Sequence, residues 1–235
     1  MQTGLPDLPS LFDPVFALRE GGDAFARAVE LAPSRGAGTL VWVRAYARAE
    51  AAVVLEPEMP LGPARLACHA AATALADTLA ALGPPEAAVA VRWPGTVLVN
   101  SGECGGARFA APPGIAEDAV PDWLVVGVEL RLAFPTGYET GATPELTALA
   151  EEGFEGVGPA DLAAGWARFL MAGLDEWQAR GPRRVAERYL ARLLDGADAP
   201  GLRRGIDPAT GALVLDRADG ARERRPLPGT PESAA

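Results

Sequence analysis

The stretch VAVRWPGTVLVN at residues 89–100 consists of two short valine-rich runs separated by Trp93-Pro94-Gly95. Apolar runs of this length, bounded by Pro, Gly and Asn, are typical of β-strands. We therefore predict strands over Val89–Trp93 and Thr96–Asn100. Asn100-Ser101-Gly102 is a turn sequence, and it is expected to lead into a further strand over Gly106–Ala110. The stretch thus predicts part of a β-sheet.

Further strand and helix patterns lie on either side of this stretch. Asp161–Arg180 has apolar residues at helical spacing, and Pro182 opens a second helix that runs to Leu194. The other expected helices are Gly22–Leu31 and Ala64–Leu82; the other expected strands are Gly38–Val43, Ala51–Glu56 and Trp123–Phe134. This order predicts an α+β (mixed α/β) core, with a mixed sheet of about six or seven strands and helices packed on one side.

A Pro/Gly-rich break at Gly196–Gly201 divides the chain. We predict a main domain over residues 1–197, whose first 17 residues form an extended lead-in. A small β unit is expected over residues 198–228, with strands at Leu202–Ile206 and Ala212–Asp216. Residues 229–235 are expected to be a disordered tail.

The composition restricts the function classes. The chain has 235 residues and a formal net charge of −10, and all 21 of its basic residues are arginine. Nucleic-acid binders neutralise phosphates with basic side chains, so we expect no nucleic-acid partner. No apolar run approaches the roughly 18 residues that cross a bilayer, and no signal peptide is recognisable, so we expect no membrane association and a cytoplasmic location. Cys68, Cys104 and the single histidine, His69, lack metal-ligand spacing, which predicts no metal site. His69 is expected at the surface of a helix or half-buried.

Five segments occur in the order, and near the spacing, of segments in a known family. They are Arg92–Val99 (K-W-P-N-D in the family), Glu103–Gly106 (K-x-x-G), Trp123–Val128 (the strand before G-I-N), Thr147–Gly153 (the segment before the C-terminal cap) and Arg204–Leu215 (G-I-D and G-x-L-x-L of that cap). Over residues 18–225 the chain therefore resembles the biotin/lipoate-protein ligase family, in particular a biotin-protein ligase catalytic domain.

The resemblance has several implications. Residues 1–197 would form a ligase-like catalytic domain, and residues 198–228 an SH3-like C-terminal cap. Such enzymes attach biotin or a lipoyl-type acid to a lysine of a biotinyl or lipoyl carrier domain through an acyl-adenylate. Biotin or a lipoate-type acid is thus the implied ligand, and ATP and Mg²⁺ are implied only where adenylation is retained.

The chain departs from the family pattern at the positions that carry the chemistry. The family's glycine-arginine loop is shortened to a polar connection at Arg44–Glu50, and the lysine of K-x-x-G is Glu103. The Asn-Asp after Trp-Pro is Gly95-Thr96, and the asparagine of G-I-N falls at Arg131. Because losing one transition-state donor costs about 10²- to 10³-fold in rate, we expect impaired or altered adenylation.

Arginines are the available substitutes for the missing groups. The candidate catalytic residues are Arg48, Arg92, Glu103 and Arg131; the candidate ligand-binding residues are Arg44, Trp93, Gly105 and Gly106. Each has a structural alternative: the charges would face solvent, the tryptophan would belong to the core, and the glycines would let two backbones pass closely. We also expect Glu103 to approach Arg131 or to share a polar network with Arg92, since a carboxylate in a half-buried cleft is costly without a cation.

Three functions are compatible with these residues. The first is a ligase of the biotin/lipoate class that uses arginines in place of the lysine. The second is a catalytically degenerate pseudo-ligase that binds a small carboxylic acid or a carrier domain. The third is a structural or regulatory subunit that retains only the fold. Function has to be argued from the site rather than from the fold, so whether the chain is an enzyme depends on the cleft.

Overall fold

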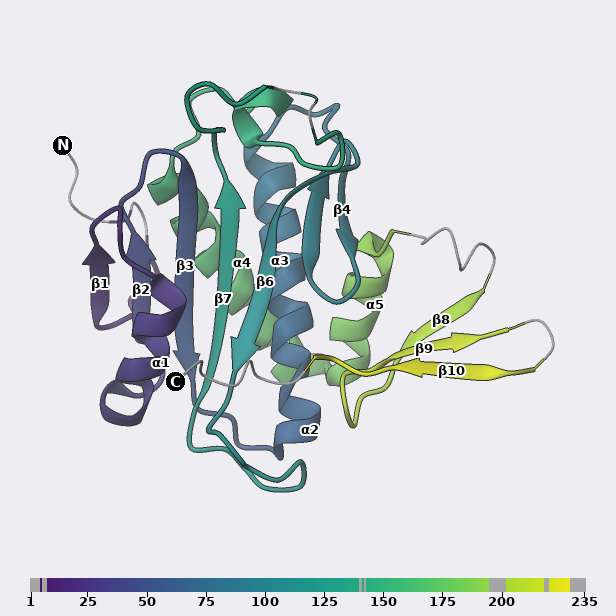
Figure 1. Ribbon diagram of the computed structural model, residues 1–235. Coiled ribbons are helices and arrows are strands. Elements are labelled where there is room, and N and C mark those ends of the chain that lie inside the picture. Colours follow the sequence, from purple (N-terminus) through teal and green to yellow (C-terminus); the bar gives the residue numbers. More distant parts are fainter. Residues whose placement is uncertain are drawn as a thin grey trace.

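The computed structural model describes residues 5, 8–139, 141, 143–194, 202–217 and 220–228. Its strands are β1 (Val15–Leu18), β2 (Leu40–Val43), β3 (Arg48–Leu55), β4 (Val89–Arg92), β5 (Thr96–Val99), β6 (Gly102–Ala110), β7 (Leu124–Arg131), β8 (Arg203–Ile206), β9 (Leu213–Asp216) and β10 (Arg222–Arg225). Its helices are α1 (Ala24–Arg35), α2 (Leu61–Ala64), α3 (Leu66–Leu82), the 3₁₀ helix η1 (Leu149–Glu152), α4 (Pro159–Arg180) and α5 (Pro182–Arg192) (Figure 1).

Seven strands form one mixed sheet in the order β1-β2-β3-β7-β6-β5-β4. β1 pairs with β2 in parallel, and the other pairs are antiparallel. β5 and β6 are joined by Asn100 and Ser101, which have φ angles of 47° and 74°. Positive φ at both central residues is the requirement of a two-residue hairpin turn, so the predicted turn at Asn100-Ser101-Gly102 is confirmed. The α+β class and the seven-stranded sheet are also confirmed.

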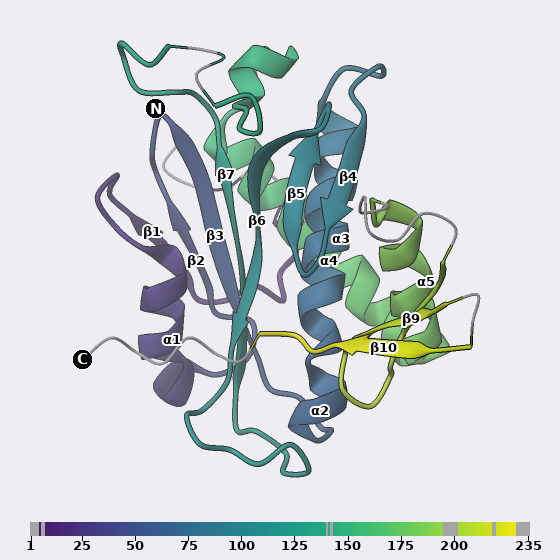
Figure 2. The ribbon, with the colours of Figure 1, turned by 45° about the vertical axis from the view of Figure 1, so that its right-hand side comes forward.

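The helices cover both faces of this sheet. Along β7, Val126 and Leu130 pack on the side of α3 and α4, whereas Val125 packs on the side of α1. Figures 1 and 2 show α1 on one side of the sheet and α3 and α4 on the other. The expectation that helices lie on one face therefore holds for α3, α4 and α5, and α1 is the exception. Most of its apolar residues are alanines, apart from Phe25, Val29 and Leu31, and they cover only part of the opposite face.

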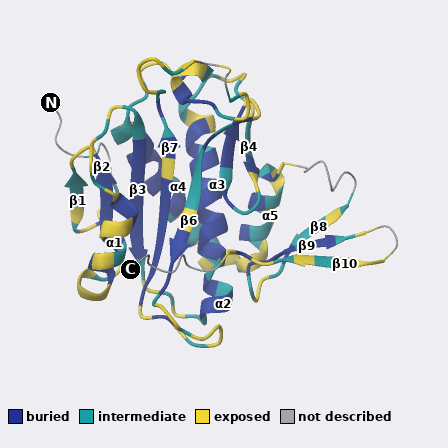
Figure 3. Cartoon of the chain, viewed as in Figure 1, coloured by how far each residue is buried: buried dark blue, intermediate teal, exposed yellow. Residues whose placement is uncertain are grey.

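α3 is the central helix of the core. It is rich in alanine, and most of its residues are buried on all sides between the sheet, α4 and α5 (Figure 3). A helix that is apolar all round is expected in this position. The predicted single helix is divided at Arg65 into α2 and α3. Within the described residues, no helix is long and apolar enough to span a bilayer.

Two predicted boundaries near the N-terminus are wrong. Residues 15–17 were assigned to an extended lead-in, but together with Leu18 they form β1 at the edge of the sheet. Arg48 and Glu50 were assigned to a polar connection, but they lie in β3 opposite Arg131 and Glu129 of β7. Their charges concealed the strand, because they point to the open face while the intervening alanines point into the core.

The C-terminal residues form a second, three-stranded antiparallel sheet in the order β10-β9-β8. Two of its strands match the prediction, and β10 was missed because its sequence, Arg-Glu-Arg-Arg, is almost wholly charged. His69 of α3 donates Nε2–H to the carbonyl of Gly211 at 2.8 Å, which ties this unit to the main domain. The predicted break at 196–201 and the tail at 229–235 lie outside the described residues, and the SH3-like character of the unit stays a prediction.

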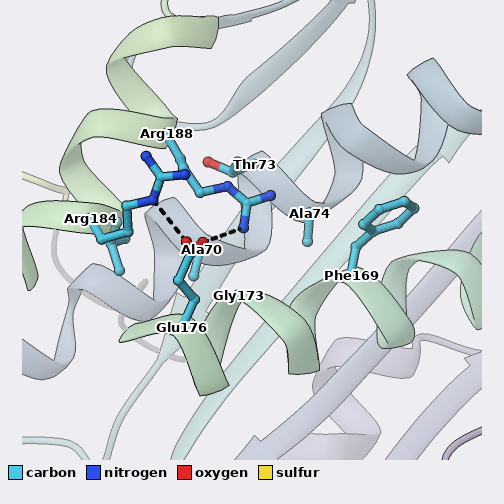
Figure 4. A pocket seen from close by; sticks show the side chains of 9 residues that line it. Ala70, Thr73, Ala74, Phe169, Gly173, Glu176, Arg184 and Arg188 are labelled. Carbon is cyan, nitrogen blue, oxygen red and sulfur yellow. Dashed lines mark hydrogen bonds and ion pairs between the residues drawn. The ribbon is translucent and has the colours of Figure 1, made fainter. Parts of the chain in front are cut away.

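A cluster of ion pairs fastens α5 to α3 and α4. Asp77 of α3 accepts hydrogen bonds from Arg188 at 2.5 Å and Arg192 at 2.7 Å. Glu176 of α4 accepts from Arg184 at 2.8 Å and Arg188 at 3.1 Å (Figure 4). The cavity beside them measures only about 10 Å³. That is space for one water molecule at most, so the cluster is a structural clamp rather than a ligand site.

Replacing Asp77 with alanine is expected to lower the free energy of unfolding by about 1–2 kcal/mol, because two charge-assisted hydrogen bonds between α3 and α5 are lost. The Asp77 side chain is only 15% exposed, so water does not replace these partners fully. Urea denaturation of Asp77→Ala beside Asp175→Ala, an exposed aspartate of α4, measures the difference. Equal losses in the two variants would show that the clamp contributes nothing.

Candidate functional site

A cleft of about 620 Å³ lies on the α1 side of the sheet, over the part that α1 leaves uncovered. Its floor is formed by β3, β7 and β6, whose side chains there are either charged or very small. The charged residues that line it are Glu20, Arg48, Glu103, Arg108, Glu129 and Arg131. The small ones include Ala45, Ala47, Gly95, Gly105 and Gly106. The floor of the cleft is therefore polar, and along its sides a ligand can reach the protein backbone.

The structure brings five of the eight predicted site residues into this cleft. Arg48, Glu103, Arg131, Gly105 and Gly106 line it, and Arg92 reaches its edge through Glu103. A Cβ atom on Gly105 would lie 2.0 Å from the carbonyl oxygen of Glu129, so this glycine is required where β6 passes β7.

Arg44 and Trp93 do not line the cleft. The side chain of Arg44 is exposed at the end of β2. The ring of Trp93 packs against His69 and Tyr189, at centroid distances of 5.4 and 6.2 Å. Trp93 thus belongs to the apolar contacts on the other face of the sheet.

Glu103, which the sequence analysis assigned to the position of the family's lysine, belongs to a polar network. Its carboxylate accepts a hydrogen bond from Nη2 of Arg92 at 2.5 Å. Arg131 donates to the backbone carbonyls of Glu103, at 3.2 Å, and of Thr147, at 2.9 Å. The expected network is confirmed, with the difference that Arg131 binds the main chain of Glu103 and not its carboxylate. Arg131 is thus held in place without its charge being neutralised by Glu103.

The N-terminus of α1 is occupied by a carboxylate of the protein itself. Glu50, which is only 4% exposed, accepts hydrogen bonds from the backbone N–H groups of Ala24, at 2.8 Å, and Phe25, at 3.4 Å. Asp23 caps the same helix by accepting from Ala26 N–H at 2.8 Å. Free N–H groups at a helix start attract anions, and here two acidic side chains satisfy them.

Two arginines balance this buried carboxylate. Arg48 lies 3.3 Å from Glu50 and also donates to the carbonyl of Gly22. Arg108 lies 3.5 Å from both Glu50 and Asp23, and its guanidinium stacks over the ring of Phe25 at 4.4 Å. The sequence analysis did not identify Arg108 or Glu50 as site residues. Alternation of charged and apolar residues along β3 and β6 was the signal that could have found them.

Burial raises the pKa of Glu50, and the neighbouring Asp23 carboxylate adds to the rise, while the N–H groups of Phe25 and Ala24 oppose it. Partial burial acts on Asp23 in the same sense, but the hydrogen bond from Ala26 N–H and the charge of Arg108 outweigh it, so the pKa of Asp23 is lowered. Asp23 therefore holds its negative charge more firmly than Glu50 does, since Glu50 is the deeper of the two.

Arg131 and Glu129 differ from Arg48, Glu103 and Arg108 of the cleft in their ion pairing. Among the residues that the structure describes, no ion pair joins Arg131 to a carboxylate or Glu129 to a cation. Arg131 lies directly opposite Arg48 in the β3–β7 ladder, and like charges placed opposite each other are unfavourable. An anion bound between these arginines would relieve that repulsion.

Neither cysteine is available as a nucleophile. Burial raises the pKa of Cys68 and that of Cys104 to about 12 in each case, so both remain protonated thiols. In the described parts of the chain, no group of three His, Cys, Asp or Glu residues is arranged to hold a metal ion. The ionisable side chains that line the cleft are arginines, glutamates and Cys104.

Sequence comparisons agree with this architecture. A model of the biotin/lipoate A/B protein ligase family matches residues 8–191. The chain belongs to this family. It is also 33% identical over 211 residues to a biotin–[acetyl-CoA-carboxylase] ligase from Paracoccus denitrificans, a match that covers 83% of this chain and 84% of that protein. The resemblance found in the five sequence segments is thereby confirmed.

Solved structures show the same fold. A biotin protein ligase-like protein of unknown function from Silicibacter sp. TM1040 superimposes with a TM-score of 0.79 at 30% identity, covering 94% of this chain and 96% of that chain. A biotin protein ligase from Aquifex aeolicus in complex with biotin and ATP superimposes with a TM-score of 0.69 at 12% identity, covering 93% and 97%. At this low identity the second similarity concerns the fold alone.

Proposed function

We propose that this family member binds a small carboxylic acid of the biotin or lipoate type in its cleft, and that it is impaired in adenylation. The observation that carries the proposal is the state of the cleft arginines. Arg48, Arg92 and Arg108 are each engaged by a carboxylate of the protein. Arg131 instead donates to two backbone carbonyls, and it pairs with no carboxylate among the residues that the structure describes. Arg131 is therefore the guanidinium with capacity for the carboxylate of a ligand.

The positioning of Arg131 supports this role. Because its Nη1 is fixed by the carbonyls of Glu103 and Thr147, little side-chain freedom remains to be lost on binding. A guanidinium presents its remaining N–H groups in a rigid fork that matches a carboxylate. The acid would thus be oriented with its carboxylate over the end of β7.

The same charges disfavour a bound nucleotide. A triphosphate needs several uncommitted cations or N–H groups, but the α1 terminus is already satisfied by Glu50 and Asp23. Glu103 and Glu129 would add repulsion to phosphate from the cleft wall and floor. We therefore expect weak or absent binding of ATP with Mg²⁺, and we derive no catalytic step through them. Calorimetry showing micromolar ATP affinity would contradict this part of the proposal.

Arg131→Gln is expected to weaken the binding of biotin or lipoate by about tenfold or more, because charge-assisted hydrogen bonds contribute about 1.5–3 kcal/mol. A ligand that binds only the native state raises the unfolding temperature, so thermal shift and calorimetry both report the loss. Arg44→Gln is the matched control, since Arg44 is exposed and lies outside the cleft. An Arg131→Gln protein that binds acids as well as the unmodified chain would refute the assignment.

An active ligase is the second candidate function, favoured by the 33% identity to the Paracoccus denitrificans ligase. In that case ATP, Mg²⁺ and an acid would yield pyrophosphate, and the acyl group would pass to a lysine of a biotinyl or lipoyl carrier domain. The binding protein proposed here releases no pyrophosphate above background. Pyrophosphate release together with labelling of a carrier domain would establish the ligase instead, and failure of every acid to bind would leave only a structural role.

A further inference from the structure

Arg131 shares the floor of the cleft with a carboxylate that has no counterpart. Glu129 lies two residues before it in β7, a strand in the interior of the sheet, and its side chain is exposed to the cleft. This exposed carboxylate is hydrated in the open cleft, and it would lose that hydration when a ligand covers it. Among the described residues, no cation forms an ion pair with Glu129.

The side chains of Glu129 and Arg131 place two opposite charges on the same face of β7. Residues i and i+2 of a strand point to the same face, and a rise of about 3.3–3.4 Å per residue places their Cα atoms roughly 7 Å apart. Arg131 uses Nη1 for two backbone carbonyls and is drawn toward the ring of Phe134, at 5.4 Å. These contacts hold its guanidinium away from Glu129, so the two charges do not cancel each other.

The neighbouring strand β3 has the same order of charges. In the β3–β7 ladder Arg48 lies opposite Arg131, and Glu50 lies opposite Glu129. The floor thus has an arginine end and a glutamate end. Arg48 and Glu50 are already engaged with each other and with the start of α1, which leaves the β7 residues as the two charges open to a ligand.

We propose that the ligand is an amino carboxylic acid, whose carboxylate pairs with Arg131 and whose ammonium group pairs with Glu129. This inference rests on the pairing of Arg131 with a ligand carboxylate in the proposed function. It changes the rest of the ligand, from the uncharged tail of a biotin- or lipoate-type acid to a tail that carries a cationic amine a few bonds away. An uncharged hydrocarbon tail would have to lie over the Glu129 carboxylate and remove its hydration without compensation. An ammonium group compensates it directly.

Three probe molecules measure the separate contributions of the ammonium group and the carboxylate to binding. ε-Aminocaproate carries both groups, caproate lacks the amine, and hexylamine lacks the carboxylate. In calorimetric titrations of the full chain, ε-aminocaproate is expected to bind about tenfold more tightly than caproate, and hexylamine more weakly than either. Glu129→Gln is expected to abolish the preference for ε-aminocaproate while leaving caproate binding in place. Glu86→Gln removes the same charge at an exposed position outside the cleft and is expected to keep the preference.

The outcomes distinguish this inference from the function on which it rests. If caproate and ε-aminocaproate bind within twofold of each other, the pairing of the amine is refuted and acid binding stands. If neither of them binds but biotin or lipoate does, this inference fails and the proposed function stands; if no acid binds, both proposals fail. If Glu129→Gln and Glu86→Gln lower the preference equally, the effect comes from net charge, and the pairing with Glu129 is refuted. Chemical denaturation of both variants establishes that each is folded under the titration conditions.

Discussion

Replacing Glu50 with alanine is expected to lower the free energy of unfolding by about 2–3 kcal/mol. This is less than for a fully buried ion pair, because the side chains of Arg48 and Arg108 are 30% and 43% exposed and water can hydrate them. Glu50 is 4% exposed and accepts from the N–H groups of Ala24 and Phe25, so its loss also leaves two donors at the start of α1 without a partner. Arg48 and Arg108 lose their shared carboxylate at the same time. Urea denaturation at neutral pH measures the change.

Two further variants separate the contributions to this loss. Glu50→Gln keeps an acceptor oxygen for the helix terminus but removes the charge, so it is expected to be less harmful than Glu50→Ala. Glu20→Ala removes an exposed glutamate from the same cleft and is expected to change stability by no more than about 0.5 kcal/mol. A loss below about 1 kcal/mol for Glu50→Ala would show that the cluster does not stabilise the fold.

The strands around residue 93 could be predicted because local signals there agree with the tertiary structure. Valine-rich runs, a Pro-Gly break and Asn100-Ser101 at positive φ specify β4, β5 and the following turn without reference to the rest of the chain. The helical periodicity of α4 was sufficient for the same reason. Local patterns do not predict how strands and helices are arranged in space. That arrangement was predicted from the five segments that occur in the same order as in the family.

Part of the candidate site could be predicted, because a residue that is matched to a family motif is expected at the same place in the shared fold. Glu103 and Arg131 were located in this way, and both line the cleft. Arg108 and Glu129 were missed, because neither falls on a family motif. Their significance arises only when β6, β7 and β3 lie side by side.

Apart from the pairing of Glu103 with Arg92, the ion pairs of the cleft could not be predicted. Sequence placed Arg48 and Arg131 in one class, as arginines replacing missing cations. The structure separates them, because Arg48 is engaged by Glu50 and by the carbonyl of Gly22, and Arg131 is engaged by no described carboxylate. Pairing depends on which strands are neighbours and on their register, and no local pattern in β3 encodes that it lies beside β7.

His69 is expected to make the protein lose stability as the pH falls from about 6.5 to about 4. The sequence indicated a surface or half-buried residue, but His69 is fully buried among Trp93, Tyr189 and the Gly211 carbonyl. Burial lowers its pKa to about 4, although the hydrogen bond to Gly211 opposes this. The unfolded chain therefore binds a proton before the folded chain does, and stability present above pH 6.5 declines by up to about 3 kcal/mol on acidification.

His69→Gln isolates this contribution, because glutamine can also donate to the Gly211 carbonyl but does not titrate. Carboxylates titrate in the same range and affect both proteins, so the quantity to compare is the difference between their unfolding free energies at each pH. That difference is expected to shift in favour of the variant by about 3 kcal/mol between pH 6.5 and 4. The physical reason is that His69 Nδ1 has no hydrogen-bond partner among the described residues, and a proton placed there would be a buried charge without a counter-ion from them. Parallel pH curves for the two proteins would show that His69 is protonated as readily when folded as when unfolded.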